Sequence, residues 1–498
     1  MNNYHRQSGH SGFSYGKSLK RVIFTTACVA VILFPASLSY SQQDRAAEIF
    51  QQASQNIQKY RMGTATISFS TGAGKPVDGA TVVIEQTSHD FLFGNIIFPL
   101  IGVLGKHDRQ IYEPELFKRR FKGLFNFAIF PFYWSAYEEI PGREEWNKIV
   151  PVVEWCNANG ITAKGHPLAW VERGGTPRWL YEMPVPLTEE LLKARIIRIV
   201  RGFKGQIDIW DVVNEPTHTI SWSAVMKAPF GTRYTSRPIN EIADWVDKCY
   251  RWAREANPEA TLIINDYEQI VSEFIPDTRE RFYKLVAELK KRGTPIDGIG
   301  LQAHAKEYWY SPEQFWDTLE YYSTLELPIH ITEFIPQSSG NEIKGEWKKG
   351  KWTREAQAEF AEQIYRLSFG HPSVASINWW GLSDRYIWSE RPGGGLIDEK
   401  DRLWRGDDRR DIGAAAKIHR LLGFQADKTG CAVATIAFIV TFFRTHSAFG
   451  FQLAGTCNGG GHQTNRATGP TTTSTRARAR PGSPRRATVG VNSAIDRN

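Results

Sequence analysis

Residues 188–215, TEELLKARIIRIVRGFKGQIDIWDVVNE, decide the fold of this chain. The part up to residue 205 is typical of a helix that ends at a glycine, and IDIWDVVNE (207–215) is typical of a short apolar strand that closes on polar residues. The next apolar run, TLIINDY (261–267), ends in the same way after another helical stretch. Strands that alternate with helices predict βαβ units and a parallel sheet.

The same alternation continues outward in both directions. Eight βα units predict an α/β fold in which the strands close into a (β/α)8 TIM barrel with long loops. An open doubly wound sheet is the alternative, and it is disfavoured because no strand is followed by a GxGxxG turn. The eight expected strands lie within residues 91–98, 125–131, 161–170, 207–215, 261–267, 296–304, 328–334 and 375–382.

Two alternating segments precede the barrel. TATISFS (64–70) and ATVVIEQ (80–86) flank the turn-rich TGAGKPVDG, which predicts a β-hairpin and hence a small N-terminal β-appendage. We therefore divide the chain into a signal peptide (1–41), a lead-in of a helix and the hairpin (42–90), a catalytic barrel (91–424) and a basic low-complexity tail (425–498).

The composition describes a folded body with basic ends. The chain has 498 residues, of which 41% are hydrophobic, so a disordered or collagen-like chain is excluded. Residues 1–41 contribute +4 and residues 425–498 contribute +7 to the net charge of +8, which leaves −3 for the body. A near-neutral body gives no electrostatic reason to expect a nucleic-acid partner.

The N-terminus has the three parts of a secretory signal. Basic residues within 17–21 precede the apolar run 22–34, and Ser39 and Ser41 frame a cleavage site before Gln42. The apolar run is short for spanning a bilayer, so we expect a secreted or periplasmic protein without stable membrane insertion. We also expect the protein to be a monomer.

The C-terminal tail and the cysteines carry little further signal. The apolar run 431–443 is also below spanning length, and the Thr-, Arg-, Gly- and Pro-rich remainder predicts disorder. No CxxC spacing occurs, so neither a disulfide framework nor a zinc site is expected. Cys156 and Cys249 are expected to be buried thiols on helices.

Polar side chains close most of the predicted barrel strands. The active sites of TIM barrels lie at the carboxyl ends of the strands, so these side chains are candidates for one site. Glu215 closes the fourth strand and Glu333 the seventh, on opposite sides of the mouth. Two carboxylates that flank one bond are what glycoside hydrolysis requires. The polar strand ends are His166, Asn214, Glu215, Asp266, Gln302, His304, Glu333 and Trp380.

Two segments carry a resemblance to a known family. WDVVNEP (210–216) and HITEF (330–334) resemble the acid/base and nucleophile segments of glycoside hydrolase family 10, the endo-1,4-β-xylanase family. Further blocks occur in the family's order, and the resemblance covers roughly residues 62–424. These blocks are PVDGATVVIEQTSHDFLFGN (76–95), GHPLAW (165–170), NDYE (265–268), GIGLQAH (298–304) and WWGLSDRYIW (379–388).

The resemblance implies a retaining endo-β-glycanase that acts on xylan or a related polysaccharide without a cofactor or metal. Glu215 would be the acid/base and Glu333 the nucleophile, with His304 hydrogen-bonded to Glu333. Trp380 and Trp388 would wall the subsite of the reacting sugar, and Tyr267 would face the leaving group. The same subsite would be lined by His166, Trp170, Asn214, Gln302 and His304. His166, His304 and His330 do not have the spacing of metal ligands.

Two positions depart from the family. Members usually carry Glu-Asn-x-x-Lys-Trp after the second strand, where this chain has IFPFYW (129–134), so only Trp134 remains. Aromatic surface replaces groups that would bind hydroxyls, which puts specificity for xylan in question. Ile335 stands where the family has an Asp that orients the equivalent of His304, so the imidazole could be held less firmly.

Two other functions remain open on the sequence alone. The altered 129–134 segment leaves room for a catalytically weak carbohydrate-binding barrel. The long segments 216–245 and 335–356 leave room for a barrel glycosidase that acts from a chain end or on another β-glycan.

Overall fold

The computed structural model describes residues 42–71, 81–86, 89–102, 113–172, 174–181, 183–218, 237–272, 277–387, 392–397, 433–439, 451–456 and 487–490. For residues 63–71, 81–86 and the last three ranges it describes the backbone only. The predicted signal peptide, Trp388 and most of the predicted tail lie outside the described residues.

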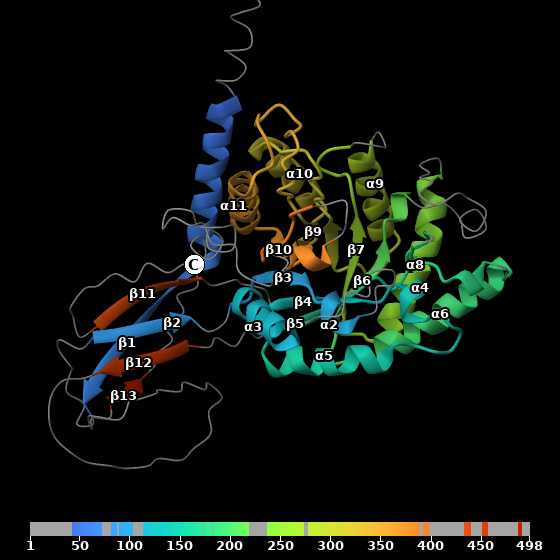
Figure 1. Cartoon of the computed structure of the whole chain (residues 1–498), viewed down its shortest axis with the longest axis horizontal. Helices are drawn as coiled ribbons and strands as arrows, with labels where there is room; N and C mark the ends of the chain where they lie inside the picture. Colours follow the sequence, from blue (N-terminus) through green and yellow to red (C-terminus); the bar gives the residue numbers. More distant parts are fainter. Residues whose placement is uncertain are drawn as a thin grey trace, which may run out of the picture.

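Eight parallel strands form a closed barrel, as the sequence predicted (Figure 1). Their order around the barrel is β10-β3-β4-β5-β6-β7-β8-β9, so neighbours in the chain are neighbours in space and β10 closes on β3. Seven lie within the segments expected from the sequence, and β10 begins one residue before its expected segment, 375–382. The strands are β3 (Leu92–Ile96), β4 (Phe127–Pro131), β5 (Thr162–His166), β6 (Ile209–Asn214), β7 (Thr261–Asp266), β8 (Gly298–Leu301), β9 (Ile329–Phe334) and β10 (Val374–Trp379).

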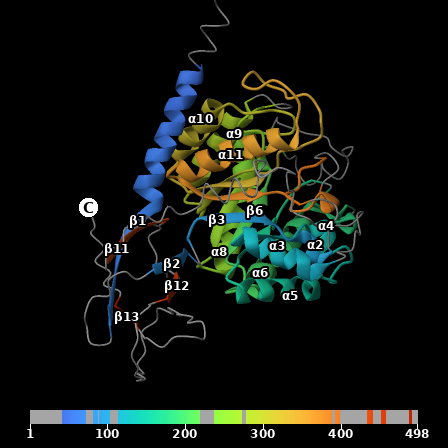
Figure 2. The same ribbon diagram turned by 60° about the vertical axis from the view of Figure 1, so that its left-hand side comes forward.

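Helices connect successive strands and cover the outside of the barrel (Figures 1 and 2). They are α2 (Phe98–Ile101), α3 (Pro114–Leu124), α4 (Trp134–Tyr137), α5 (Trp146–Ala158), α6 (Val185–Gly202), α8 (Ile239–Ala256), α9 (Thr278–Lys291), α10 (Pro312–Ser323) and α11 (Arg354–Gly370). Short turns of helix lie at η1 (Ile57–Arg61), η2 (Arg178–Leu180), η3 (Pro216–His218) and η4 (Asp384–Tyr386).

Helical periodicity explains why these segments dock as they do. In α8 the buried residues include Ile242, Val246, Cys249 and Ala253, which recur every three or four positions and so share one face. Cys156 on α5 and Cys249 are both free and buried, as expected. No helix in the described part of the chain combines the length and the apolar character needed to cross a bilayer.

The barrel interior is filled by side chains, with almost no free space between strands. Trp210 on β6 is fully buried and lies against Gly165 on β5. A Cβ atom at position 165 would lie 2.1 Å from the Trp210 ring, so only glycine fits there. This close fit fixes the end of β5, the strand that carries His166 at its carboxyl terminus.

A helix over residues 42–56 packs on the outside of the barrel beside α11 (Figure 2). Its Ile49 and Ala53 are fully buried, and Ser54 accepts a hydrogen bond from Arg366 of α11. Directly after this helix, the buried Arg61 guanidinium donates to the carbonyl oxygens of Phe369, His371 and Val374. These bonds fasten the lead-in to the end of α11 and the start of β10.

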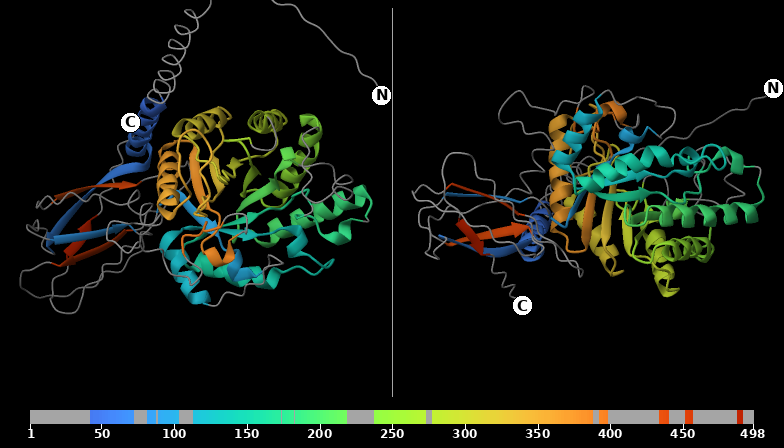
Figure 3. Two further views of the ribbon diagram at one scale, coloured as in Figure 1. Left: turned by 45° about the horizontal axis from the view of Figure 1, so that its top comes forward. Right: turned by 90° about the horizontal axis from the view of Figure 1, so that it is seen from below.

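The β-appendage stands to one side of the barrel (Figure 3), but its pairing differs from the expected hairpin. Strands β1 (Met62–Thr71) and β2 (Thr81–Gln86) pair with strands from the far end of the chain. The sheets are β11-β1-β13 and β12-β2, with β11 at Val433–Ile439, β12 at Phe451–Thr456 and β13 at Ala487–Gly490. The strand predictions at β1 and β2 were therefore right and their mutual pairing was wrong. Three short segments of the predicted tail supply the partner strands.

Candidate active site

Glu215 and Glu333 occupy the carboxyl ends of β6 and β9, facing the mouth of the barrel. Glu215 follows β6 directly with φ of 54°, a left-handed conformation that a non-glycine residue adopts at a cost of about 1–3 kcal/mol. Its backbone N–H donates to the carbonyl of Asn265 at 2.7 Å, which holds the residue in this conformation. Such strain is typical of positions whose side-chain direction serves a function.

The Glu215 carboxylate is held by two N–H donors. The Trp170 indole donates to Oε2 at 2.9 Å, and the Gln302 amide donates to Oε1 at 3.0 Å. Glu215 is nevertheless partly exposed at the surface of the mouth. The carboxylate is therefore fixed in direction while remaining within reach of a ligand in the mouth.

The Glu333 carboxylate is more enclosed and has its own set of partners. The side chain is 7% exposed. The Asn265 amide donates to Oε1 at 2.9 Å, and His304 Nε2 lies 3.0 Å from Oε2. His166 Nε2 lies 3.9 Å from Oε1. Glu333 thus sits among one amide donor and two imidazoles.

A chain of amide groups connects the two carboxylates. Asn214 Oδ1 accepts from Asn265 at 2.8 Å and, more weakly, from Gln302 at 3.4 Å. Because Asn265 also binds Glu333 and Gln302 also binds Glu215, both carboxylates belong to one network across the mouth. A Cβ atom at position 300 would lie 2.5 Å from Asn265 Oδ1, so Gly300 on β8 leaves room for this network.

Burial and mutual repulsion set the protonation of this pair. Burial, opposed by the Gln302 hydrogen bond, and the charge of Glu333 raise the pKa of Glu215 to about 7. Burial raises the pKa of Glu333 to about 7 as well, against the lowering effects of His166, Asn265 and Lys164. Two carboxyl groups that repel each other titrate as a pair, so one proton is shared near neutral pH.

A buried chain of groups fixes the His166 ring. His166 Nδ1 lies 2.7 Å from Asp211 Oδ2, which also pairs with Lys164 at 2.7 Å. Burial alone would raise the pKa of Asp211, but Lys164 and His166 hold it below its usual value. The Asp211 carboxylate can only accept, so Nδ1 donates to it, and Nε2 faces the Tyr133 hydroxyl at 3.1 Å.

Tyr133 is one of the site residues that the sequence analysis did not identify. It was noted only as a replacement within IFPFYW, yet its ring packs edge-on against His166, Trp170 and Phe98. Burial, followed by the charges of Glu333, Glu215 and Asp211, raises its pKa well above the usual value, so it remains a neutral donor.

Ile129, another replacement in this segment, forms an apolar wall beside Tyr133 together with Ile335. Ile129 and Ile335 are both fully buried and belong to one cluster with Trp380, which was expected at the site. The ring of Trp380 packs edge-on against Phe98 and His166. The two departures from the family are thus neighbours in space, and one apolar surface replaces both polar positions.

The other expected residues occupy different places. Tyr267 stacks on His218 at a ring separation of 3.7 Å, and His218 is held by Asp266 at 2.6 Å. His330 lies deeper in the barrel, with Nδ1 2.8 Å from the Ser376 hydroxyl. Trp388 lies outside the described residues, so its expected place at the site remains a prediction.

Asn265, Asp211 and Lys164 also went unrecognised in the sequence. The sequence does contain a sign of the Lys164–Asp211 pair, because a charged residue inside an apolar strand is rarely buried unless it is paired. Lys164 and Asp211 lie inside β5 and β6, and both are fully buried.

Comparison with known proteins identifies relatives of this chain. The sequence model of glycosyl hydrolase family 10 matches residues 128–403. An endo-1,4-beta-xylanase B of Thermotoga neapolitana is 32% identical over 322 residues, covering 59% of this chain and 87% of the relative. A beta-1,4-xylanase of Dictyoglomus thermophilum is 28% identical over 293 residues, covering 58% and 78%. The crystal structure of xylanase 10B from Thermotoga maritima superimposes with a TM-score of 0.52 at 25% identity, covering 67% of this chain and 94% of that one.

Proposed function

Because the chain belongs to glycosyl hydrolase family 10, we propose that it is a secreted, retaining endo-β-glycanase that cleaves internal β-1,4 linkages of xylan or a related plant polysaccharide. It is a glycoside hydrolase of the endo-1,4-β-xylanase-like kind. The observation that carries the proposal is the single amide network that connects Glu215 and Glu333 across the barrel mouth. Cleavage of one glycosidic bond between two carboxylates needs such a shared site.

Glu215 is the proposed acid/base. The Gln302 hydrogen bond and His218 lower the pKa of Glu215, whereas burial, Glu333 and Asp266 raise it, to about 7. In the proposed role Glu215 holds the shared proton and protonates the leaving oxygen. After the sugar is transferred, the same carboxylate takes a proton from water.

Glu333 is the proposed nucleophile. Its oxygens face the His304 imidazole and the Asn265 amide, and His166 and Lys164 further favour the ionised form. In the first step Glu333 forms a bond to the anomeric carbon as the glycosidic bond breaks. Water breaks the resulting ester in the second step and restores the configuration.

The apolar wall around Tyr133 bears on the choice of substrate. A subsite that binds hydroxyls through hydrogen bonds rejects an analogue without them far more strongly than an apolar subsite does. Since Ile129 and Ile335 supply carbon only, discrimination on this side falls to the Tyr133 hydroxyl and to ring contact with Trp380. We therefore expect activity on xylan with tolerance of other β-1,4-glycans.

A polysaccharide panel tests the function. The purified protein is incubated with xylan, mixed-linkage glucan and arabinan, and new reducing ends and early product lengths are measured, with Glu333→Gln as the inactive control. Internal cleavage of xylan supports the proposal. Binding without new reducing ends would favour a carbohydrate-binding barrel, and release of one short product from the start would indicate action at chain ends.

A further inference from the structure

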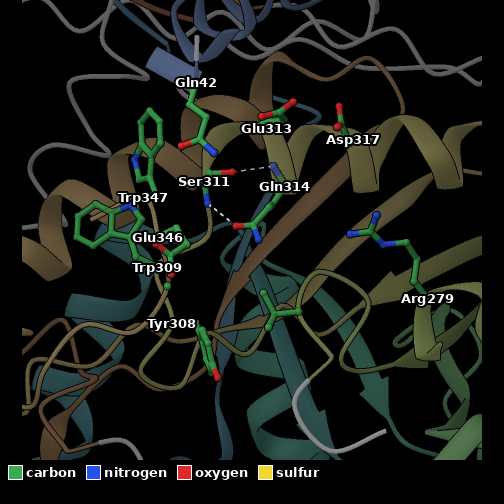
Figure 4. Close-up of a pocket in the computed structure, with 12 residues that line it drawn as sticks. Gln42, Arg279, Tyr308, Trp309, Ser311, Glu313, Gln314, Asp317, Glu346 and Trp347 are labelled. Carbon is green, nitrogen blue, oxygen red and sulfur yellow. Dashed lines mark hydrogen bonds between the residues drawn. The ribbon is translucent and has the colours of Figure 1, made fainter. Parts of the chain in front are cut away.

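A cavity opens among the segments that follow the carboxyl ends of β7, β8 and β9, the end of the barrel that also carries Glu215 and Glu333. Figure 4 shows its lining residues. The cavity encloses about 560 Å³, within the range of about 300–1,000 Å³ that is usual for small-molecule sites. Its walls come from segments that follow β7, β8 and β9 and from the start of the N-terminal helix. The lining residues used below are Tyr308, Trp309, Gln314, Asp317 and Trp347, and none of them belongs to the network of Glu215 and Glu333.

The aromatic wall of this cavity is built on a fastened loop. The segment between β9 and α11 folds back on itself through an antiparallel bridge between Glu342 and Lys351, and Ile343 donates to the carbonyl of Gly350 at 2.8 Å. Trp309 in turn donates to the carbonyl of Lys344 at 3.0 Å. Trp347 lies at the tip of this loop, half-buried against the core, and so presents a fixed ring to the cavity.

The opposite wall offers amide donors with a fixed direction. Gln314 forms the capping box of α10, in which its Oε1 accepts from the Ser311 N–H at 2.9 Å (Figure 4). Because this bond fixes the amide, the Nε2 donors face the other way. Asp317, one turn further along α10, is exposed and adds acceptor oxygens to the same wall.

We propose that this cavity is a second carbohydrate-binding site, which takes one or two sugar units of the polysaccharide outside the catalytic cleft. The inference rests on the proposed function for the identity of the polymer. An indole face suits the apolar face of a pyranose, while amide and carboxylate groups bind its hydroxyls.

The charge of the lining decides against other ligands. The cavity is lined by three carboxylates, Glu313, Asp317 and Glu346, and by one guanidinium, that of Arg279. Negative charge therefore predominates, which disfavours a phosphate or another anion. Within the described residues no cluster of His, Cys, Asp or Glu could hold a metal ion. A neutral polysaccharide meets neither obstacle.

Two sites on one face would act on the same polymer chain. A chain held at Trp347 keeps further linkages near Glu215 and Glu333, which raises their effective concentration at the cleft. The benefit applies to polymers only, since a short substrate cannot occupy both places. The second site should therefore affect the KM for xylan and leave the hydrolysis of a short substrate unchanged.

The test uses Trp347→Ala and Asp317→Ala in the full protein, with Trp252→Ala as a control. Trp252 is a half-buried tryptophan on α8 that does not line the cavity. Circular dichroism and thermal unfolding establish that each variant folds. Kinetics are measured on xylan and on an aryl β-xylobioside, and retardation in xylan-containing gels is measured in a Glu333→Gln background that prevents cleavage.

We expect Trp347→Ala to raise the KM for xylan by about 2- to 10-fold and to weaken retardation, with unchanged turnover of the aryl substrate. Asp317→Ala should change both in the same direction, and it decides the question if Trp347→Ala does not fold. Unchanged retardation and KM in both variants would overturn the second site, as would an equal loss on the aryl substrate. If the wild-type protein cleaves no polysaccharide, the proposed function fails instead, and retardation still reports on the cavity.

Discussion

Replacing Gln302 with methionine should move the alkaline limit of activity upward. Gln302 is 2% exposed, and its amide donates to Glu215 Oε1 at 3.0 Å. Methionine has a similar length and volume but cannot donate, so the change removes the bond with little loss of packing. A donor bound to a carboxylate favours the charged form, so its removal raises the pKa of Glu215.

The size of the shift follows from the strength of the lost bond. A hydrogen bond to a charged group contributes about 1.5–3 kcal/mol. One pKa unit corresponds to about 1.36 kcal/mol, so the bond is equivalent to roughly one to two units. Glu215 is partly exposed and keeps the Trp170 donor, so water replaces part of the loss. We therefore expect a rise of about one unit from the present value of about 7.

The assay is the pH dependence of kcat/KM on an aryl β-xylobioside. Its alkaline limb reports the loss of the proton from the acid/base of the free enzyme. Gln337→Met is the matched control, because Gln337 is also 2% exposed but donates to the carbonyl of Lys306. An alkaline limb that stays in place or moves downward in Gln302→Met would refute the assignment of Glu215 as the acid.

Three further predictions concern the same groups. Glu333→Gln should remove most activity on every substrate, whereas Glu215→Gln should lose about 10²- to 10⁴-fold on xylan and much less on dinitrophenyl glycosides, whose leaving group needs no proton; equal losses on both substrates would contradict these roles. Tyr133→Phe should lower kcat/KM by about 2- to 12-fold, because His166 Nε2 loses its hydrogen-bond partner. Tyr137→Phe, at a buried neighbour without that contact, should change kcat/KM less than twofold. Glu215 and Glu333 both have folded-state pKa values of about 7, above the usual 4.5, so their contribution to stability is present below pH 4.5 and is lost as pH rises through about 7. Glu333→Gln should therefore raise the urea midpoint more at pH 8 than at pH 4, and a larger gain at pH 4 would show that the pKa of Glu333 is not raised.

Local patterns in the sequence predicted the barrel strands because each strand is a short apolar run and most of them are followed by a polar residue. The same information could not pair β1 with β11, because alternation marks a strand without naming its partner. The partner of β1 lies more than 350 residues away along the chain, beyond an entire barrel. The expected hairpin paired β1 with β2, the strand nearest to it in the sequence, whereas the structure pairs each of them with strands from the far end of the chain.

The residues of the candidate site also fall into two groups, those predicted from the sequence and those seen only in the structure. Glu215, Glu333 and His304 were found because strand ends converge in a barrel and because their motifs resemble those of a known family. Tyr133 was not found, because its role depends on contacts with His166 and Trp170 from two other segments. The Ile335 substitution looked like a loss of support for His304, yet the structure places Ile335 in an apolar cluster with Ile129. Such compensation between distant positions is visible only in three dimensions.

The account depends most on the double displacement between Glu215 and Glu333. Proton NMR of the products in the first minutes of xylan hydrolysis, before mutarotation, reports the configuration at the new anomeric carbon. Retention requires the β-anomer to accumulate first. Initial accumulation of the α-anomer would mean a single displacement by water, and neither carboxylate could then have the role given to it here.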